Sequence, residues 1–171
     1  MHSELGFGSL KSRNLSVLST KEKVKLHDII TDEKLLTIPC VPVKDFDEGK
    51  KIADILFEIL ADQQNGIGLA ANQIGINKAV CVVNITAPLW FLNPEFVPAN
   101  DAKINFNEAC LSFPEKTVIT ERYKEIYVTS NNFDNVLHFG PWNVLECVCV
   151  QHEISHLLGK TMYDFEVNNE K

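Results

Sequence analysis

The sequence QHEISHLLGK, residues 151–160, contains the pattern HExxH, formed by His152, Glu153 and His156. On an α-helix, four residues rotate by about 400° and rise by about 6 Å, so both imidazoles lie on one face, one turn apart. The two histidines can therefore reach one metal ion, and Glu153 beside them can take a proton from water. The pattern indicates a metal-dependent hydrolase built on a helix. The alternative is a helix whose two histidines only pair with carboxylates.

The residues around this pattern predict the helix itself. Asn143 can cap the first turn, and Gly159 is suited to end it, so we expect a helix over residues 144–158. The helix is apolar around Cys147 and Cys149, and we expect these two cysteines to be small buried core residues.

A catalytic zinc-type centre has three protein ligands, so a third ligand is needed. Met162 stands where a metzincin would have a third histidine, and only Glu166 and Glu170 could serve as the downstream glutamate of a thermolysin-like site. Cys149 lies on the same helix, but three ligands there would spread over about 10 Å of its axis. The third ligand must therefore come from another element. Cys110, in the polar stretch NEACLSFPE at residues 107–115, is the leading candidate, and we expect a loop there.

Composition limits the class of protein. The chain has 171 residues, 45% of them hydrophobic, and a formal net charge of −7, which suits one folded domain and argues against a nucleic-acid binder. The apolar runs fall short of the roughly 20 residues that span a membrane. Five cysteines cannot all pair within the chain, which favours a reducing compartment.

The rest of the chain predicts an α+β domain. Residues 1–23 are rich in Ser and Lys and are expected to form a loosely ordered arm, with a transit peptide as the alternative; residues 24–171 form one catalytic domain. An amphipathic helix starts after Asp45 and stops near residues 65–66. Short strands are expected near residues 79–85, 89–92, 117–120 and 125–130. Strands that do not alternate with helices favour α+β over repeated βαβ units.

Three segments resemble, in order and spacing, the motifs of peptide deformylases: GIGLAANQ at residues 66–73, EACLS at 108–112 and QHEISH at 151–156. The resemblance runs from about residue 25 to residue 164 and implies that family's α+β fold, with antiparallel or mixed sheets around a central metal-binding helix. It implies that Cys110, His152 and His156 bind one divalent metal ion, with water as fourth ligand. Iron(II) is expected in vivo, and zinc, nickel or cobalt are alternatives.

The resemblance also implies a role for each remaining motif residue. Glu153 would be the general acid and base, while Gln73 and the backbone N–H of Leu111 would stabilise the oxyanion. The residues expected to bind substrate are Gly66, Ile67, Gly68, Leu69, Glu108 and Ala109. The reaction implied is removal of the formyl group from N-formylmethionyl peptides, with release of formate.

The sequence departs from the family pattern in three places. Ala109 stands where a glycine is usual, which matters if the backbone needs a positive φ there. Ser155 stands where an aspartate is usual and so removes a carboxylate that could pair with an arginine such as Arg122. Arg122 is read either as that supporting arginine or as a solvated surface charge. Little sequence follows the third motif, which indicates a short form without the long C-terminal helix, phage-encoded or organellar.

The resemblance further implies a monomer that acts on nascent peptides near the ribosome exit, with no membrane and no sequence-specific nucleic acid as partner. The expected location is the cytoplasm of a bacterium or a phage-infected cell, with an organelle as the alternative. Two other functions remain open: a catalytically weak or silent relative that binds formyl peptides, and a small HExxH metallopeptidase.

Overall fold

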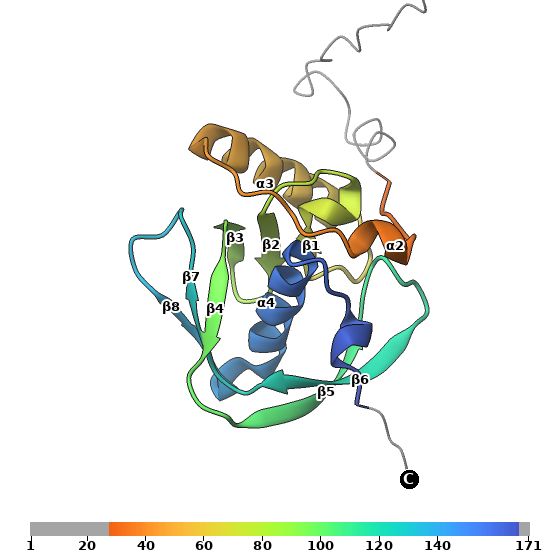
Figure 1. Ribbon diagram of the computed structural model, residues 1–171, viewed down its shortest axis with the longest axis vertical. Helices are drawn as coiled ribbons and strands as arrows, with labels where there is room; N and C mark the ends of the chain where they lie inside the picture. The colour runs from red at the N-terminus through yellow and green to blue at the C-terminus, as the bar shows by residue number, and fades with distance from the viewer. Residues whose placement is uncertain (1–27, 168–171) are drawn as a thin grey trace, which may run out of the picture.

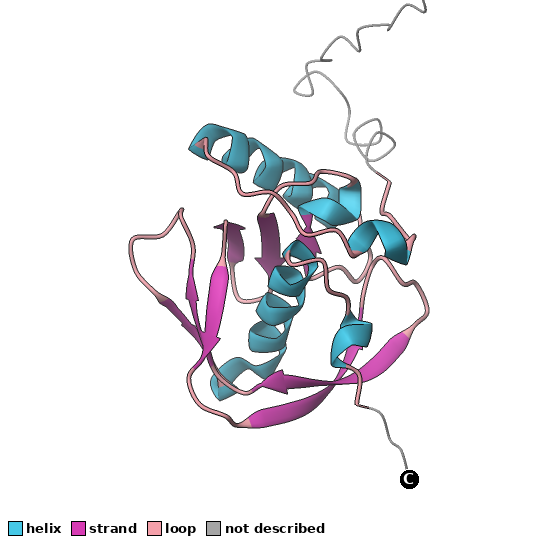
Figure 2. Ribbon diagram, in the orientation of Figure 1, coloured by secondary structure: helices cyan, strands magenta, loops and turns pink. Residues whose placement is uncertain are grey.

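The computed structural model describes residues 28–167, and the predicted arm at residues 1–23 lies outside this range. Within it, one long helix runs through the middle of the molecule and three small sheets surround it (Figure 1). Helices and strands are both present, and all the strand pairs described are antiparallel (Figure 2). The predicted α+β class is confirmed.

The first long helix, α3, spans Phe46–Ala61, close to the prediction. Its N-cap is Asp45, whose side chain accepts a hydrogen bond from the backbone N–H of Asp47 and so satisfies one free donor of the first turn. Its apolar stripe packs into one core cluster with the first sheet, through residues that include Ile52, Leu56 and Ile59. A short helix, α2 (Glu33–Leu36), precedes it.

The first sheet has the order β1-β2-β3, with β1 at Gly68–Ala70, β2 at Val80–Asn84 and β3 at Pro88–Leu92. The small-residue segment of the first motif supplies β1 and the start of the following 3-10 helix η2 (Ala71–Ile74). β1 is fully buried, because this sheet lies between α3 and the central helix (Figure 1).

In the view of Figure 1, one of the other two sheets lies to the left of the central helix and the other lies below it. One has the order β4-β7-β8, with β4 at Glu95–Pro98, β7 at Ile126–Thr129 and β8 at Leu137–Phe139. The other is a long hairpin of β5 (Lys103–Ala109) and β6 (Thr117–Tyr123). β5 ends directly before Cys110, and this position brings the cysteine to the central helix.

The central helix, α4, spans Val144–Leu157, one residue shorter than predicted. The side chain of Asn143 accepts a hydrogen bond from the N–H of Glu146, and Gly159 adopts the positive φ of 71° expected after a helix end. Every residue from position 146 to position 157 is buried, so the HExxH pattern lies inside the protein. Short 3-10 helices flank α4: η3 (Pro141–Asn143) before it and η4 (Met162–Phe165) after it.

The expectation of a loop at residues 107–115 was partly wrong, because residues 107–109 belong to β5. The strand was missed because its buried face ends in a charged residue, Glu108, rather than an apolar one. β4 and β8 were also missed; both are short, and Phe139 is the one buried residue that they contain.

Among residues 28–167, no helix is both long and apolar enough to cross a membrane. All five cysteines lie in the described range and all are free thiols.

Candidate metal centre and active site

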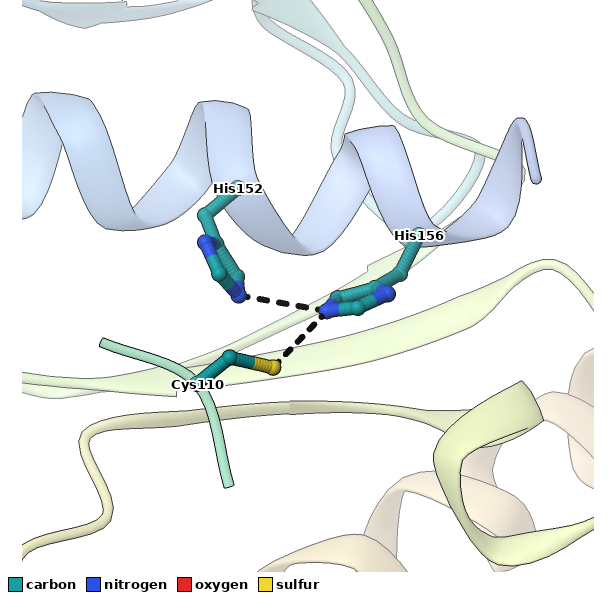
Figure 3. Close-up of side chains that lie close together, drawn as sticks. All are labelled: Cys110, His152 and His156. Atoms are coloured by element: carbon teal, nitrogen blue, oxygen red, sulfur yellow. Dashed lines mark hydrogen bonds between the residues drawn. The ribbon is translucent and has the colours of Figure 1, made fainter. Parts of the chain in front are cut away.

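The structure brings the three predicted metal ligands together. The Sγ of Cys110 and ring nitrogens of His152 and His156 all lie within 4.8 Å of one another. The two Nε2 atoms are 3.1 Å apart, and the Sγ is 3.3 Å from Nε2 of His156. Figure 3 shows both imidazoles extending from α4 toward the cysteine, which comes from a separate segment. Cys149 is not in this cluster, as its distance along the helix predicted.

Hydrogen bonds outside the cluster hold the ring of His152 and the backbone of His156 in place. Nδ1 of His152 lies 2.7 Å from Oε2 of Glu108 and donates its proton to that carboxylate, which leaves Nε2 free to bind a cation. The end of α4 is fixed by Asn72, whose Nδ2 donates to the backbone oxygen of His156 at 2.7 Å.

The pKa values in the cluster fit a bound cation. Burial lowers the pKa of His156 well below its usual range, so this imidazole is neutral and can act as a ligand. Burial also acts to lower the pKa of His152, but hydrogen bonds with Cys110 and Glu108 outweigh it and raise that pKa to about 10. The groups around His152 attract a positive charge, which raises its affinity for a proton. A divalent cation bound to these ligand atoms would take the place of that proton. Two imidazoles and one thiol are a donor set suited to a transition metal, so the residues fit the ion that the sequence implies.

Glu108 belongs to a buried polar network that the sequence did not reveal. Burial alone would raise its pKa, but hydrogen bonds from His152 and Arg122 outweigh this effect and hold the pKa at about 2. Thr120 adds a hydrogen bond from its hydroxyl to Oε1. The carboxylate is thus ionised and holds the ring of His152, whereas the sequence suggested only contact with substrate.

Arg122 is 2% exposed, so its interpretation as a surface charge was wrong. Its Nε and Nη2 donate to the two oxygens of Glu108 at 2.6 and 3.0 Å, and its Nη1 donates to Oγ of Ser155 at 3.1 Å. The ring of Phe165 covers the guanidinium at 3.8 Å. Ser155 therefore keeps a hydrogen bond to the arginine, although it cannot supply a second carboxylate.

A cavity of about 470 Å³ opens beside the cluster. The predicted site residues that line it are Gly66, Ile67, Gly68, Gln73, Glu108, Ala109, Cys110, Leu111, His152 and Glu153. Leu69 is different: its side chain is fully buried in the core with α3 and is not among the lining residues. Alternation along β1 explains this, since neighbouring side chains in a strand point to opposite faces.

Glu153 lies against this cavity with one oxygen, Oε2, that has no hydrogen-bond partner among the described residues. Burial raises the pKa of Glu153 to about 7. A group whose pKa is close to the pH of its surroundings can both accept and donate a proton. Gly68 makes room for it, because a Cβ there would lie 2.4 Å from Oε1 of Glu153 and 2.9 Å from Sγ of Cys149.

Gln73 is buried, and its side chain is held from both ends. Its Oε1 accepts a hydrogen bond from the N–H of Ala70 at 2.8 Å, which fixes the orientation of the amide. Its Nε2 then points toward the cluster, 3.1 Å from Oγ of Ser112 and 3.5 Å from Sγ of Cys110. A fixed N–H donor beside this cluster can stabilise negative charge that develops there.

Ala109 lies at the end of β5 and lines the cavity. Among the described residues other than glycine, only Asn93 and Glu115 have a positive φ, so the backbone at Ala109 needs no glycine. This departure from the family pattern brings no backbone strain.

Sequence reasoning missed the apolar wall of the cavity. It is formed by Phe106 of β5 together with Leu145, Val148 and Cys149 of α4. The four residues are apolar, and nothing in their sequence distinguishes a cavity wall from ordinary core. The helical spacing of Leu145, Val148, Cys149 and His152 does place all four on one side of α4.

Comparisons with known proteins agree with this geometry. The family model described as polypeptide deformylase matches residues 26–171. A peptide deformylase of Teredinibacter turnerae is 34% identical over 142 residues, which are 80% of this chain and 83% of that protein.

Solved structures give the same result. A peptide deformylase from Synechococcus elongatus in complex with actinonin has a TM-score of 0.74 and 28% identity, over 84% of this chain and 80% of that one. A probable peptide deformylase from Synechococcus phage S-SSM7 has a TM-score of 0.72 and 31% identity, over 81% of this chain and 99% of that one. The sequence motifs, the ligand cluster and these matches together place the chain in the polypeptide deformylase family.

Proposed function

We propose that this protein is a metal-dependent peptide deformylase, which hydrolyses the formyl group from N-formylmethionyl peptides and releases formate. The observation that carries the proposal is the convergence of Cys110, His152 and His156 beside the carboxylate of Glu153, at the wall of a cavity large enough for a peptide end. The family to which the chain belongs performs this reaction.

A formamide is a poor electrophile, so both the formyl oxygen and the attacking water must be activated. When bound, the metal ion supplies Lewis-acid polarisation of the formyl oxygen and a lower pKa for water. Glu153 accepts the proton of the attacking water and later delivers it to the departing peptide nitrogen, so that the products are formate and a free amine. Its unpartnered Oε2 and its pKa of about 7 support both steps.

Negative charge develops on the formyl oxygen as water attacks. Gln73 supports this step with Nε2, which is already held toward the ligand cluster by the bond from Ala70 to its oxygen. The backbone N–H of Leu111, directly after Cys110 and at the cavity wall, is the second donor in our proposal.

The substrate lies with its formyl end at the ligand cluster and its first side chain against the apolar wall of Phe106, Val148 and Cys149. A thioether such as methionine suits such a wall, because it is apolar and flexible. Gly66, Ile67, Gly68 and Ala109 border the same cavity and contact the peptide in this arrangement.

The resemblance to the family is the reason to propose iron(II) as the metal in vivo; the donor set itself suits zinc, nickel or cobalt as well. We further propose that the protein works as a monomer on nascent peptides near the ribosome exit, in the cytoplasm of a bacterium or a phage-infected cell; an organelle is the alternative. The proposed substrate is a nascent peptide that begins with formylmethionine, and such peptides support a place of action near the ribosome.

The other two functions are not favoured. A metallopeptidase of the thermolysin type needs a downstream carboxylate, whereas here Cys110 completes the ligand cluster. A catalytically silent relative would be favoured if Ala109 distorted the backbone or if Ser155 lost its contact with Arg122. Ala109 has no backbone strain, and Ser155 still accepts a hydrogen bond from Arg122.

The test is formate release from formyl-Met-Ala-Ser by protein purified and loaded with iron(II) without oxygen. We expect turnover that a chelator abolishes and a divalent metal restores, and no cleavage of internal bonds in an unformylated peptide. The absence of formate release at full metal occupancy would overturn the proposal.

A further inference from the structure

A second cavity, of about 190 Å³, lies beside the first. Most of the residues that line it are apolar: Ile104 of β5, Pro141 of η3, and Val144, Cys147 and Val148 of α4, with Tyr123 and Lys124 at the end of β6. No step of the proposed reaction uses this space.

The two cavities follow one seam between α4 and β5. Along β5, alternate side chains face the same way, so Ile104, Phe106 and Glu108 share a face. Glu108 contacts His152 at the ligand cluster, Phe106 lines the first cavity and Ile104 lines the second.

The helix repeats this order. Residues four apart on a helix share a face, so Val144, Val148 and His152 lie in a row along α4. His152 is at the ligand cluster, and Val144 lines the second cavity. Of residues 28–167, Val148 is the one that lines both cavities, and it is 3% exposed. Its side chain therefore stands between the pocket for the first substrate residue and the space behind it.

We propose that Val148 determines which first side chain the enzyme accepts: it closes the pocket at the length of methionine, and the second cavity is an extension that longer unbranched apolar side chains enter when Val148 is shortened. The proposal rests on the proposed deformylase function. The apolar lining of the second cavity suits alkyl groups attached to the thioether sulfur.

The partition between the two cavities is formed by Val148 and not by its neighbours on α4. Leu145 and Cys149 line only the first cavity, and Val144 and Cys147 line only the second. Shortening any of these four enlarges one cavity but leaves the partition in place.

The test compares two substrates that differ only in the first side chain: formyl-Met-Ala-Ser and the same peptide with S-propyl-homocysteine in place of methionine. The measured quantity is the ratio of their kcat/KM values, propyl over methyl. Because one methylene in an apolar pocket changes kcat/KM by about tenfold or more, we expect the Val148→Ala variant to raise this ratio at least about tenfold over wild type.

Two further variants serve as controls. Val150→Ala makes the same change two residues along α4, in the core and away from both cavities, and should leave the ratio as in wild type. Adding Ile104→Phe to Val148→Ala fills the second cavity from β5 and should return the ratio toward the wild-type value.

Val148→Ile makes the partition between the cavities thicker and should lower the propyl-over-methyl ratio below that of wild type. This variant therefore tests the proposal if Val148→Ala fails to fold. A ratio that stays within twofold of wild type in both Val148 variants would overturn the proposal. So would an equal rise in Val150→Ala. Failure of the deformylase function itself is distinguishable, since wild type would then release no formate from either peptide.

Discussion

Gly68 shows how one missing side chain shapes the site. Its backbone passes so close to α4 that a Cβ would lie 2.4 Å from Oε1 of Glu153, and this carboxylate has little room to retreat because it is buried. A glycine here is required by the carboxylate of Glu153 and by the thiol of Cys149, not by backbone conformation. The position of Gly68 in the first motif is thereby explained by contact with the third.

We therefore expect Gly68→Ala to move Glu153 and to lower kcat on the order of tenfold to 100-fold, because small misplacements of a catalytic group have large effects. Formate release at equal metal content measures this loss. Gly49→Ala is the matched control: its Cβ also meets a side chain, Leu92 Cδ1 at 2.5 Å, but in α3 and outside the cavity. Equal activity of Gly68→Ala and wild type would contradict this account of the glycine.

At the scale of the elements, Arg122 connects β6 to β5 through Glu108 and to α4 through Ser155. Replacing Arg122 by Met leaves the Glu108 carboxylate buried with less compensation, and breaking a buried ion pair in this way costs about 3–5 kcal/mol. We expect Arg122→Met to lower the free energy of unfolding of the metal-free protein by about that amount in urea titrations.

The control on the same hairpin is Lys103→Met, which removes an exposed ion pair with Glu121. Exposed pairs contribute about 1 kcal/mol or less, so its unfolding midpoint should stay near that of wild type. Similar losses in the two variants would show that the buried network is not what stabilises the hairpin against α4.

The end of α4 gives a second prediction about an element. Gly159 has a φ of 71°, and a Cβ there would lie 2.6 Å from the backbone oxygen of Thr37. Gly159→Ala is therefore expected to destabilise the fold by more than about 1 kcal/mol, since both the backbone angle and the contact oppose it. Thermal unfolding measures this, with the neighbouring exposed Leu158→Ala as control, which should change stability by about 0.5 kcal/mol or less.

The elements also show what the sequence could and could not predict. α3 and α4 were predictable because caps and helical spacing are local signals, visible at Asp45, Asn143 and Gly159. β5 was not, since its buried face ends in Glu108, whose burial makes sense only once Arg122 and His152 surround it. The HExxH spacing and the family motifs predicted that Cys110, His152 and His156 would lie together, as they do in the structure. The buried network was not, because it joins residues from three elements by tertiary contacts.

At the scale of the whole molecule, the proposed metal ligands come from parts of the fold that have separate cores. Cys110 belongs to the small cluster with Leu36 and Met162, whereas the residues around the histidines on α4 pack mainly with the second cluster. A metal ion that binds Cys110, His152 and His156 would bind the folded state and not the unfolded chain, and would stabilise all of it.

We accordingly expect metal to raise Tm. An ion at 1,000 times its Kd adds about 4 kcal/mol, which for a chain of this size is a rise on the order of 10 °C. Calorimetry with and without iron(II) or cobalt(II), free of oxygen, measures the shift. Cys110→Ser should lose most of it, and a shift that is unchanged in this variant would remove Cys110 from the ligand set.

The central claim is that Glu153 moves the proton in a site held by Cys110, His152 and His156. The most direct test measures formate release from formyl-Met-Ala-Ser by wild type and Glu153→Gln, both loaded with iron(II) to the same measured metal content. Loss of a general acid and base predicts a kcat lower by about 100-fold or more, with the metal retained. A Glu153→Gln variant that works within a few-fold of wild type would contradict the account.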